Sequence, residues 1–346
     1  MGKMDNLEFV DLREELEKNH IAWDSPACCS SKESSYSLLR AQMQGTFQFS
    51  REGVWIKDFE HDKKCLSLLH LAKQKSCDLV LFPEYCISDQ VLWDIVSDEA
   101  LWPENRKLWV LPCQGMTKDQ FQAFIENLSK NNRVFLLDTA CTSRRVTFNH
   151  FVTVLFYCFL GYQGDASILC LVPQLKTQPM GDQDCLCEQA GMATGSVVFT
   201  LEQRLLTLLC ADSMNNELTW QRLQEEGLLM SGLTILHPQL NGHPKDQVFS
   251  RLRWELFERG TPGVYITCNW AAGTTLSSPE CQEAAKTIDL SWSCLYRKHA
   301  DDIFEKWERN YSLRRNNEAH GLFGTIMKPK RTEVWFSLSH EEALEL

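Results

Sequence analysis

The sequence has 346 residues, 44% hydrophobic and 23% charged, a composition that allows a full hydrophobic core and excludes wholesale disorder. The formal net charge is -11, with 46 acidic against 35 basic residues, which disfavours bulk binding of nucleic acid. The fifteen cysteines are an odd number and mostly stand inside apolar runs, where a thiol behaves as a small hydrophobic group. The start lacks a signal-peptide core, and the longest apolar run, Phe151 to Leu160, is too short to cross a membrane. We therefore expect a reducing, cytoplasmic location and no membrane association.

The first 35 residues are expected to form an N-terminal arm, in which a charged, helix-prone stretch at 7–19 precedes a serine-rich stretch at 25–37. From residue 36 to residue 346, apolar strand-like runs alternate with amphipathic helices, a pattern typical of an α/β domain. We predict helices at 63–75, 121–130, 218–226, 247–259 and 301–310. We predict strands at 79–82, 134–138, 151–160, 168–172, 197–200, 205–209, 233–237 and 263–269, and a last hairpin at 323–338.

A carboxylate follows the predicted strand at 79–82. Pro83 ends this apolar strand and places Glu84 at its carboxyl end, where open α/β sheets bind their ligands. A carboxylate held at a dry strand end can serve as a general base, because burial raises its pKa. Taken alone, Glu84 also fits an ordinary carboxylate in a strand-to-helix loop.

A lysine and a cysteine stand at the ends of later strands. Lys176 is the only lysine between Lys130 and Lys245, and it follows the strand at 168–172, where it can donate to a developing oxyanion. Cys210 ends the strand at 205–209 and precedes a polar turn, where a base, a lysine and backbone amides can activate a thiol. The alternatives are a solvated lysine and a buried structural cysteine.

The order Glu, Lys, Cys, each at the end of an apolar strand, resembles the nitrilase, or carbon–nitrogen hydrolase, superfamily over most of the chain. The run from Cys77 to Glu84 resembles the signature in which a strand delivers the catalytic glutamate. Cys210, Ala211 and Asp212 resemble the Cys-x-Asp nucleophile motif, 34 residues after Lys176. Asn149 takes the place of an asparagine that often precedes the strands leading to the lysine, and Glu188 that of a second, supporting glutamate.

This resemblance implies a four-layer α-β-β-α sandwich and a cysteine-dependent hydrolase of a small amide or nitrile. Glu84 would be the general base, and Lys176 with the backbone N–H of Ala211 would stabilise the oxyanion. Cys210 would form a thioester, and Glu188 would orient Lys176 or the substrate amine. Asp212 and Asn149 would be supporting residues. The resemblance calls for no metal and no organic cofactor, and it implies a homo-oligomer.

The framing residues depart from the superfamily pattern. Gln174 and Leu175 precede Lys176 where arginine is usual, and the run from Ser213 to Glu217 replaces an arginine and a Pro-Glu pair. The segment from Thr274 to His320 has no part that aligns. The alternative function is therefore a nitrilase-like scaffold or assembly subunit with weak or lost catalysis. Such a subunit would act beside a protein partner, for example within a bacterial defence system or a larger enzyme assembly.

Other cysteines and histidines of the sequence suggest two alternative chemistries, a zinc site and a Cys–His dyad. Cys185 with Cys187, and Cys28 with Cys29, are close pairs, but neither has a second Cys/His pair at zinc-finger spacing nearby. A papain-like Cys–His dyad would need a histidine such as His237 or His243, and His237 fits better as a strand-end residue before Pro238. Neither alternative displaces the trio of Glu84, Lys176 and Cys210.

Overall fold

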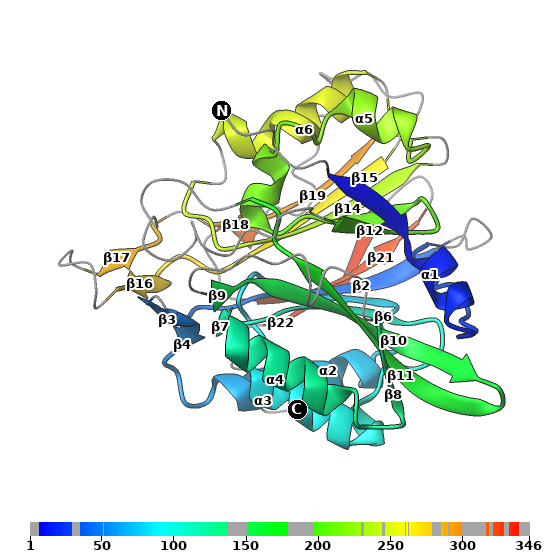
Figure 1. The fold of residues 1–346 in the computed structure, drawn as a ribbon. Coiled ribbons are helices and arrows are strands. Elements are labelled where there is room, and N and C mark those ends of the chain that lie inside the picture. Colours follow the sequence, from blue (N-terminus) through cyan, green and yellow to red (C-terminus); the bar gives the residue numbers. More distant parts are fainter. Residues whose placement is uncertain are drawn as a thin grey trace.

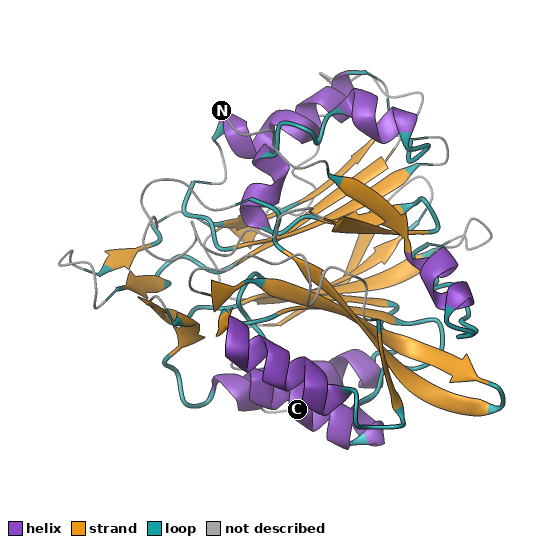
Figure 2. Cartoon of the chain, viewed as in Figure 1, coloured by secondary structure: helices purple, strands orange, loops and turns teal. Residues whose placement is uncertain are grey.

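The computed structural model contains two β-sheets that pack face to face, with helices on both outer sides (Figures 1 and 2). The structure describes residues 7–29, 35–50, 52–137, 151–178, 197–229, 232–243, 246–259, 261, 263–278, 285–289, 291–298, 316–317, 321–328 and 332–338. Among the helices of these residues, none combines the length and the apolarity needed to cross a bilayer.

The larger sheet has eight strands. In spatial order they are β22 (Thr332–Leu338), β21 (Gly321–Met327), β2 (Tyr36–Gln42), β5 (Leu79–Leu81), β6 (Leu108–Pro112), β10 (Val154–Gln163), β11 (Ala166–Leu175) and β8 (Val134–Leu136). Strands β2, β5 and β6 run parallel, and their connections carry α2 (His61–Gln74) and α3 (Asp89–Ser97). The hairpins β10–β11 and β21–β22 extend this parallel centre on its two sides.

The smaller sheet has six strands. In spatial order they are β1 (Glu8–Asp11), β12 (Val197–Leu201), β13 (Leu205–Thr207), β14 (Leu233–Gln239), β15 (Gly263–Asn269) and β19 (Leu295–Lys298). Strands β13, β14 and β15 are parallel, and α5 (Trp220–Glu225) and α6 (Gln247–Glu258) lie in the connections between them. The carboxyl ends of these three strands therefore meet at one edge of the sheet.

Three hydrophobic clusters lie between successive layers. One joins α2, α3 and α4 (Lys118–Leu128) to the larger sheet, the second lies between the sheets, and the third joins the smaller sheet to α5 and α6. In β5, Leu79 and Leu81 belong to the second cluster and Val80 to the first, because successive strand residues point to opposite faces. In Figure 1 the two groups of helices lie on opposite sides of the paired sheets. The α/β class predicted from the sequence is confirmed.

The remaining elements are short. They are α1 (Leu12–Lys18), the 3₁₀ turns η1 (Glu99–Leu101) and η3 (Cys210–Met214), and the strands β3 (Thr46–Ser50), β4 (Gly53–Ile56), β7 (Met116–Thr117), β9 (Phe151–Val152), β16 (Thr275–Ser277), β17 (Lys286–Thr287), β18 (Trp292–Ser293) and β20 (Asn316–Asn317). Strands β17, β16, β3 and β4 form a small sheet at the end of the molecule where β13, β14 and β15 finish.

The predicted helices at 63–75, 121–130, 218–226 and 247–259 are confirmed as α2, α4, α5 and α6, as is the last hairpin. The prediction of one helical stretch at 7–19 is wrong for its first part, because residues 8–11 form β1 and pair in parallel with β12. Asp11 then begins α1 by accepting a hydrogen bond from the Arg13 N–H at 2.9 Å. The division at residue 35 stays a prediction, and the helix predicted at 301–310 lies outside the described residues.

Candidate active site

The side chain of Glu84 is completely buried just beyond the carboxyl end of β5. Its main-chain carbonyl accepts a hydrogen bond from the Trp270 indole Nε1 at 2.7 Å. Its Oε2 accepts a second from the main-chain N–H of Leu240 at 3.2 Å. Leu240 and Trp270 directly follow β14 and β15, so the smaller sheet fixes both ends of a residue that the larger sheet supplies.

Lys176 forms an ion pair with Glu84 inside the protein. The distance from Nζ to Oε1 is 3.0 Å, and the side chains of the lysine and the glutamate are 4% and 0% exposed. Lys176 follows β11, and its main-chain N–H donates to the Thr153 carbonyl at 3.0 Å. Desolvation of both charges makes their mutual attraction strong and the loss of either partner costly.

Cys210 is also completely buried, and it occupies an unusual backbone conformation after β13. Its φ is +40°, in the left-handed region where a residue with a Cβ is strained. Its Sγ lies 3.9 Å from the Leu240 carbonyl, while the N–H of the same leucine bonds Glu84. The thiol and the carboxylate therefore contact the two ends of one residue.

Asp212 ties the Cys210 turn to the segment after Lys176. Its Oδ1 accepts hydrogen bonds from the main-chain N–H groups of Thr177 at 2.7 Å and Gln178 at 2.9 Å, and from the Thr177 hydroxyl at 3.0 Å. Its Oδ2 accepts a bond from the Leu209 N–H at 3.0 Å. Burial raises the pKa of Asp212 to about 6, although the charge of Lys176 and the three backbone donors act to lower it.

His237 holds the same turn from the other side. Burial lowers the pKa of His237 to about 4, so the imidazole is neutral at pH 7. The Cys210 carbonyl oxygen lies 2.7 Å from His237 Nε2. Because a carbonyl oxygen can only accept a hydrogen bond, Nε2 carries the proton and donates it. The Tyr265 hydroxyl lies 2.8 Å from Nδ1 and donates to it. His237 thus contacts the main chain of Cys210 and stabilises its conformation.

Gln174, two residues before Lys176, joins the two sheets at this site. Its Nε2 donates to the Thr207 carbonyl at 2.8 Å, and its Oε1 accepts from the Phe199 N–H at 2.9 Å. Neither Gln174 nor His237 was predicted from the sequence to be a supporting residue. The signal was present in both, because each is a polar side chain in an otherwise apolar strand and so needs buried partners.

Of the predicted site residues, Glu84, Lys176, Cys210, Ala211 and Asp212 are all buried at the same end of the two sheets. Asn149 and Glu188 lie outside the described residues, as do Cys185 and Cys187. What the arrangement offers chemically is a carboxylate, an ammonium group and a thiol that share a water-excluded region. Those are the groups needed for a base, an oxyanion donor and a nucleophile.

None of the known protein-family models matches this chain, and none of the curated proteins does. Among solved structures, an amidase from Nesterenkonia sp. is similar, with 12% identity, 90% of this chain and 94% of that chain covered, and a TM-score of 0.45. A mutant of the Nesterenkonia AN1 amidase, described as a nitrilase-superfamily enzyme, has 12% identity, the same coverage and a TM-score of 0.43. A double mutant of that amidase in complex with acrylamide has 12% identity, 91% and 95% coverage, and a TM-score of 0.42. The second of these proteins is described as a member of the superfamily that the sequence motifs resemble.

Proposed function

We propose that this protein hydrolyses a carbon–nitrogen bond of a small amide or nitrile, with Cys210 as the nucleophile. The observation that carries the proposal is the meeting of three chemically complementary side chains at the strand ends of both sheets. Glu84 and Lys176 lie 3.0 Å apart, and Glu84 and Cys210 contact the two ends of Leu240. Glu84 and Cys210 are 126 positions apart in the sequence, so local sequence does not bring them together.

In the proposed reaction with an amide, Glu84 takes the proton of the Cys210 thiol as the sulfur attacks the carbonyl carbon. Lys176 Nζ and the Ala211 N–H stabilise the negative oxygen of the tetrahedral intermediate. The proton held by Glu84 passes to the leaving nitrogen, and a thioester remains on Cys210. Glu84 then removes a proton from water, which attacks the thioester, and returns that proton to the leaving sulfur, so that the acid, the free thiol and the carboxylate are restored. Burial of the ion pair supports this scheme, because electrostatic stabilisation is stronger where water is excluded.

The strained turn at Cys210 supports a functional role for that thiol. A left-handed non-glycine residue destabilises the fold by on the order of 1–3 kcal/mol and persists where surrounding contacts impose it. Here the surrounding contacts are four hydrogen bonds that Asp212 accepts and one that His237 donates to the Cys210 carbonyl. In this conformation Sγ lies 3.9 Å from the carbonyl of Leu240, the residue whose N–H donates to the Glu84 carboxylate.

The test is ammonia release from a panel of small amides and nitriles by the whole chain. We expect Cys210→Ala to abolish turnover and the wild type to show an acyl adduct on Cys210 by mass spectrometry after rapid acid quench. Cys158→Ala is the matched control, because Cys158 is equally buried but lies in β10. Full ammonia release by Cys210→Ala would disprove the nucleophile.

The second candidate is a nitrilase-like assembly subunit with weak or lost catalysis, working as a homo-oligomer or beside a protein partner. The complete burial of Glu84 and Cys210 favours it, because a substrate has to reach the thiol. The same variant separates the two proposals. A scaffold keeps its biological activity and its oligomeric state when Cys210 becomes alanine, whereas an enzyme loses the activity and keeps the state.

A further inference from the structure

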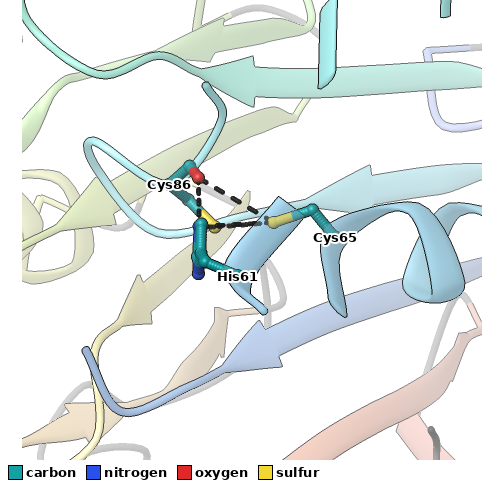
Figure 3. A group of neighbouring side chains, drawn as sticks. All are labelled: His61, Cys65 and Cys86. Carbon is teal, nitrogen blue, oxygen red and sulfur yellow. Dashed lines mark hydrogen bonds between the residues drawn. The ribbon is translucent and has the colours of Figure 1, made fainter. Parts of the chain in front are cut away.

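A second cluster of reactive side chains lies next to the Glu84 loop and takes no part in the proposed reaction. Figure 3 shows His61 and Cys65 pointing from α2 toward Cys86, which comes two residues after Glu84. His61 and Cys65 share one face of α2 because they are four residues apart. The three side chains are buried, with exposures of 3%, 0% and 0%.

The distances between the donor atoms have the dimensions of a metal site. Cys65 Sγ lies 3.8 Å from Cys86 Sγ and 3.4 Å from His61 Nε2, and Cys86 Sγ lies 3.9 Å from the same nitrogen. Around a tetrahedral zinc ion, with Zn–S of about 2.3 Å and Zn–N of about 2.0 Å, the sulfur–sulfur edge is about 3.8 Å and the sulfur–nitrogen edge about 3.5 Å. All three donor atoms lie within 4.8 Å of one another.

From this geometry we propose that His61, Cys65 and Cys86 bind one thiophilic metal ion of the zinc type. Imidazole and thiolate are the donors that zinc prefers in proteins. Two thiolates and a divalent cation have no net charge, which suits a site among apolar core residues. A disulfide is the competing use of two close cysteines, but it needs sulfur atoms about 2.0 Å apart and gives the histidine no role.

The main-chain carbonyl of Cys86 is the fourth ligand of this proposal. It lies 2.6 Å from His61 Nε2 and 3.8 Å from Cys65 Sγ. Among the residues that the structure describes, no further His, Cys, Asp or Glu joins the group. The ion would take the place of the hydrogen between Nε2 and the carbonyl oxygen, and these atoms would move apart to about 3.3 Å. The imidazole would stay neutral, because its proton would then be on Nδ1. Both thiol protons would pass to solvent, which balances the charge.

Such a site would anchor the Glu84 loop to α2. Cys86 contributes its thiolate and its carbonyl, so the ion would fix the backbone two residues from the carboxylate. The inference does not depend on hydrolysis, because it rests on the donor atoms alone. It predicts instead that metal binding stabilises the fold, since binding to the folded state adds to the free energy of unfolding.

The test is metal analysis of the reduced full-length chain. We expect about one zinc per chain by elemental mass spectrometry, and Co²⁺ titrated into chelator-treated protein should give a thiolate-to-cobalt charge-transfer band with tetrahedral visible bands. We expect Cys65→Ser and Cys86→Ser to weaken metal binding by more than about tenfold. Cys158→Ser, the same exchange at an equally buried position in β10, should leave it unchanged.

Absence of the cobalt–thiolate band from the folded wild-type chain would overturn the proposal even if the serine variants do not fold. Zinc that remains at full occupancy in Cys65→Ser and Cys86→Ser would also overturn it, since the ion would then be elsewhere. A Cys65–Cys86 disulfide in protein purified under reducing conditions would assign the pair to redox chemistry and contradict the metal site.

Discussion

The loops that carry Cys210 and Glu84 follow short parallel strands of different sheets, and each contains a left-handed residue that is not glycine. In the first loop that residue is Cys210 itself, with φ of +40°, whereas in the second it is Tyr85, with φ of +60°. The strained residue is therefore the proposed nucleophile, Cys210, in one loop and the neighbour of Glu84, Tyr85, in the other.

The groups that hold the two loops differ as well. Asp212 and His237 hold the Cys210 loop, and both are buried ionisable groups with displaced pKa values. Trp270 holds the Glu84 carbonyl with a neutral indole, and His61 contacts the Cys86 carbonyl. Burial acts to raise the pKa of Cys65, but the hydrogen bond with Cys86 and the imidazole of His61 lower this pKa to about 6. We therefore expect acid to act on the Asp212 and His237 contacts of the Cys210 loop, but not on the Trp270 contact of the Glu84 loop.

Lys176 joins the two loops, so its removal should have the largest effect. Lys176→Met keeps the aliphatic stem but leaves the Glu84 carboxylate buried beside no ammonium group. We expect kcat to fall by about 10²–10³-fold, the usual result of losing an oxyanion donor. We also expect the free energy of unfolding to fall by about 3–5 kcal/mol, because an uncompensated charge stays inside the protein. Steady-state kinetics and urea denaturation measure the two losses.

Two further variants test whether the buried ion pair causes the loss of stability in Lys176→Met. Lys64→Met removes a half-buried lysine whose Nζ lies 2.6 Å from Asp58, and it should change stability by at most about 1 kcal/mol. Adding Glu84→Gln to Lys176→Met removes the unpaired carboxylate and should restore much of the lost stability, but none of the lost turnover. A double variant that is no more stable than Lys176→Met would contradict the buried ion pair as the source of the effect.

The pH dependence of stability separates the two groups that hold the Cys210 loop. His237 has a folded pKa of about 4 against an ordinary 6.5, so the unfolded chain binds more protons and stability falls as pH drops from 6.5 to 4. Asp212 has a folded pKa of about 6 against 3.8, so the folded chain binds more protons and stability rises as pH drops from 6 to 3.8. The two contributions oppose each other over most of this range.

His237→Gln should expose the contribution of Asp212. Its stability deficit relative to the wild type should shrink by up to about 3 kcal/mol between pH 7 and pH 4, at about 1.4 kcal/mol for each pKa unit. Urea denaturation at closely spaced pH values measures this. His70→Gln, an exposed exchange in α2, supplies the reference curve. Parallel curves for His237→Gln and the wild type would mean that His237 does not titrate in this range.

The positions of Glu84, Lys176 and Cys210 after strands could be predicted from the sequence, because each follows an apolar run. Strand ends are visible locally, as Pro83 after 79–82 and the polar turn after 205–209 show. The α/β class followed in the same way from alternating strand and helix patterns, as α2 and β5 illustrate. Local patterns of this kind hold wherever one segment decides its own structure.

The partners of these residues come from distant strands, and no local pattern reports them. Leu240 and Trp270 reach Glu84 because β14 and β15 end beside β5, across the interface between two sheets. The strand β1 depends in the same way on β12, about 190 residues away in the chain, so its charged sequence favoured a helix instead. The central strand β6 was missed because a five-residue apolar run fits a strand or a buried helix equally.

Trp270→Phe addresses the neutral contact of the Glu84 loop and should have the smallest effect. The exchange keeps a buried aromatic ring but removes the Nε1–H that donates to the Glu84 carbonyl at 2.7 Å. Loss of one buried hydrogen bond, with its acceptor left unsatisfied, lowers the free energy of unfolding by about 1–3 kcal/mol. Because the loop position changes while substrate contacts remain, kcat should fall and KM should stay near the wild-type value.

Trp109→Phe, in the fully buried strand β6, is the matched control for lost ring volume. If packing alone mattered, both tryptophan variants would lose similar stability and neither would lose kcat selectively. A selective fall in kcat for Trp270→Phe, with a pH profile of stability parallel to that of the wild type, would show that the indole contact holds the Glu84 carbonyl without a titrating group. A deficit of Trp270→Phe that changes with pH would contradict this, because that contact would then respond to acid. The indole is the decisive probe because it cannot change its charge between pH 4 and pH 7, whereas Asp212 and His237 do.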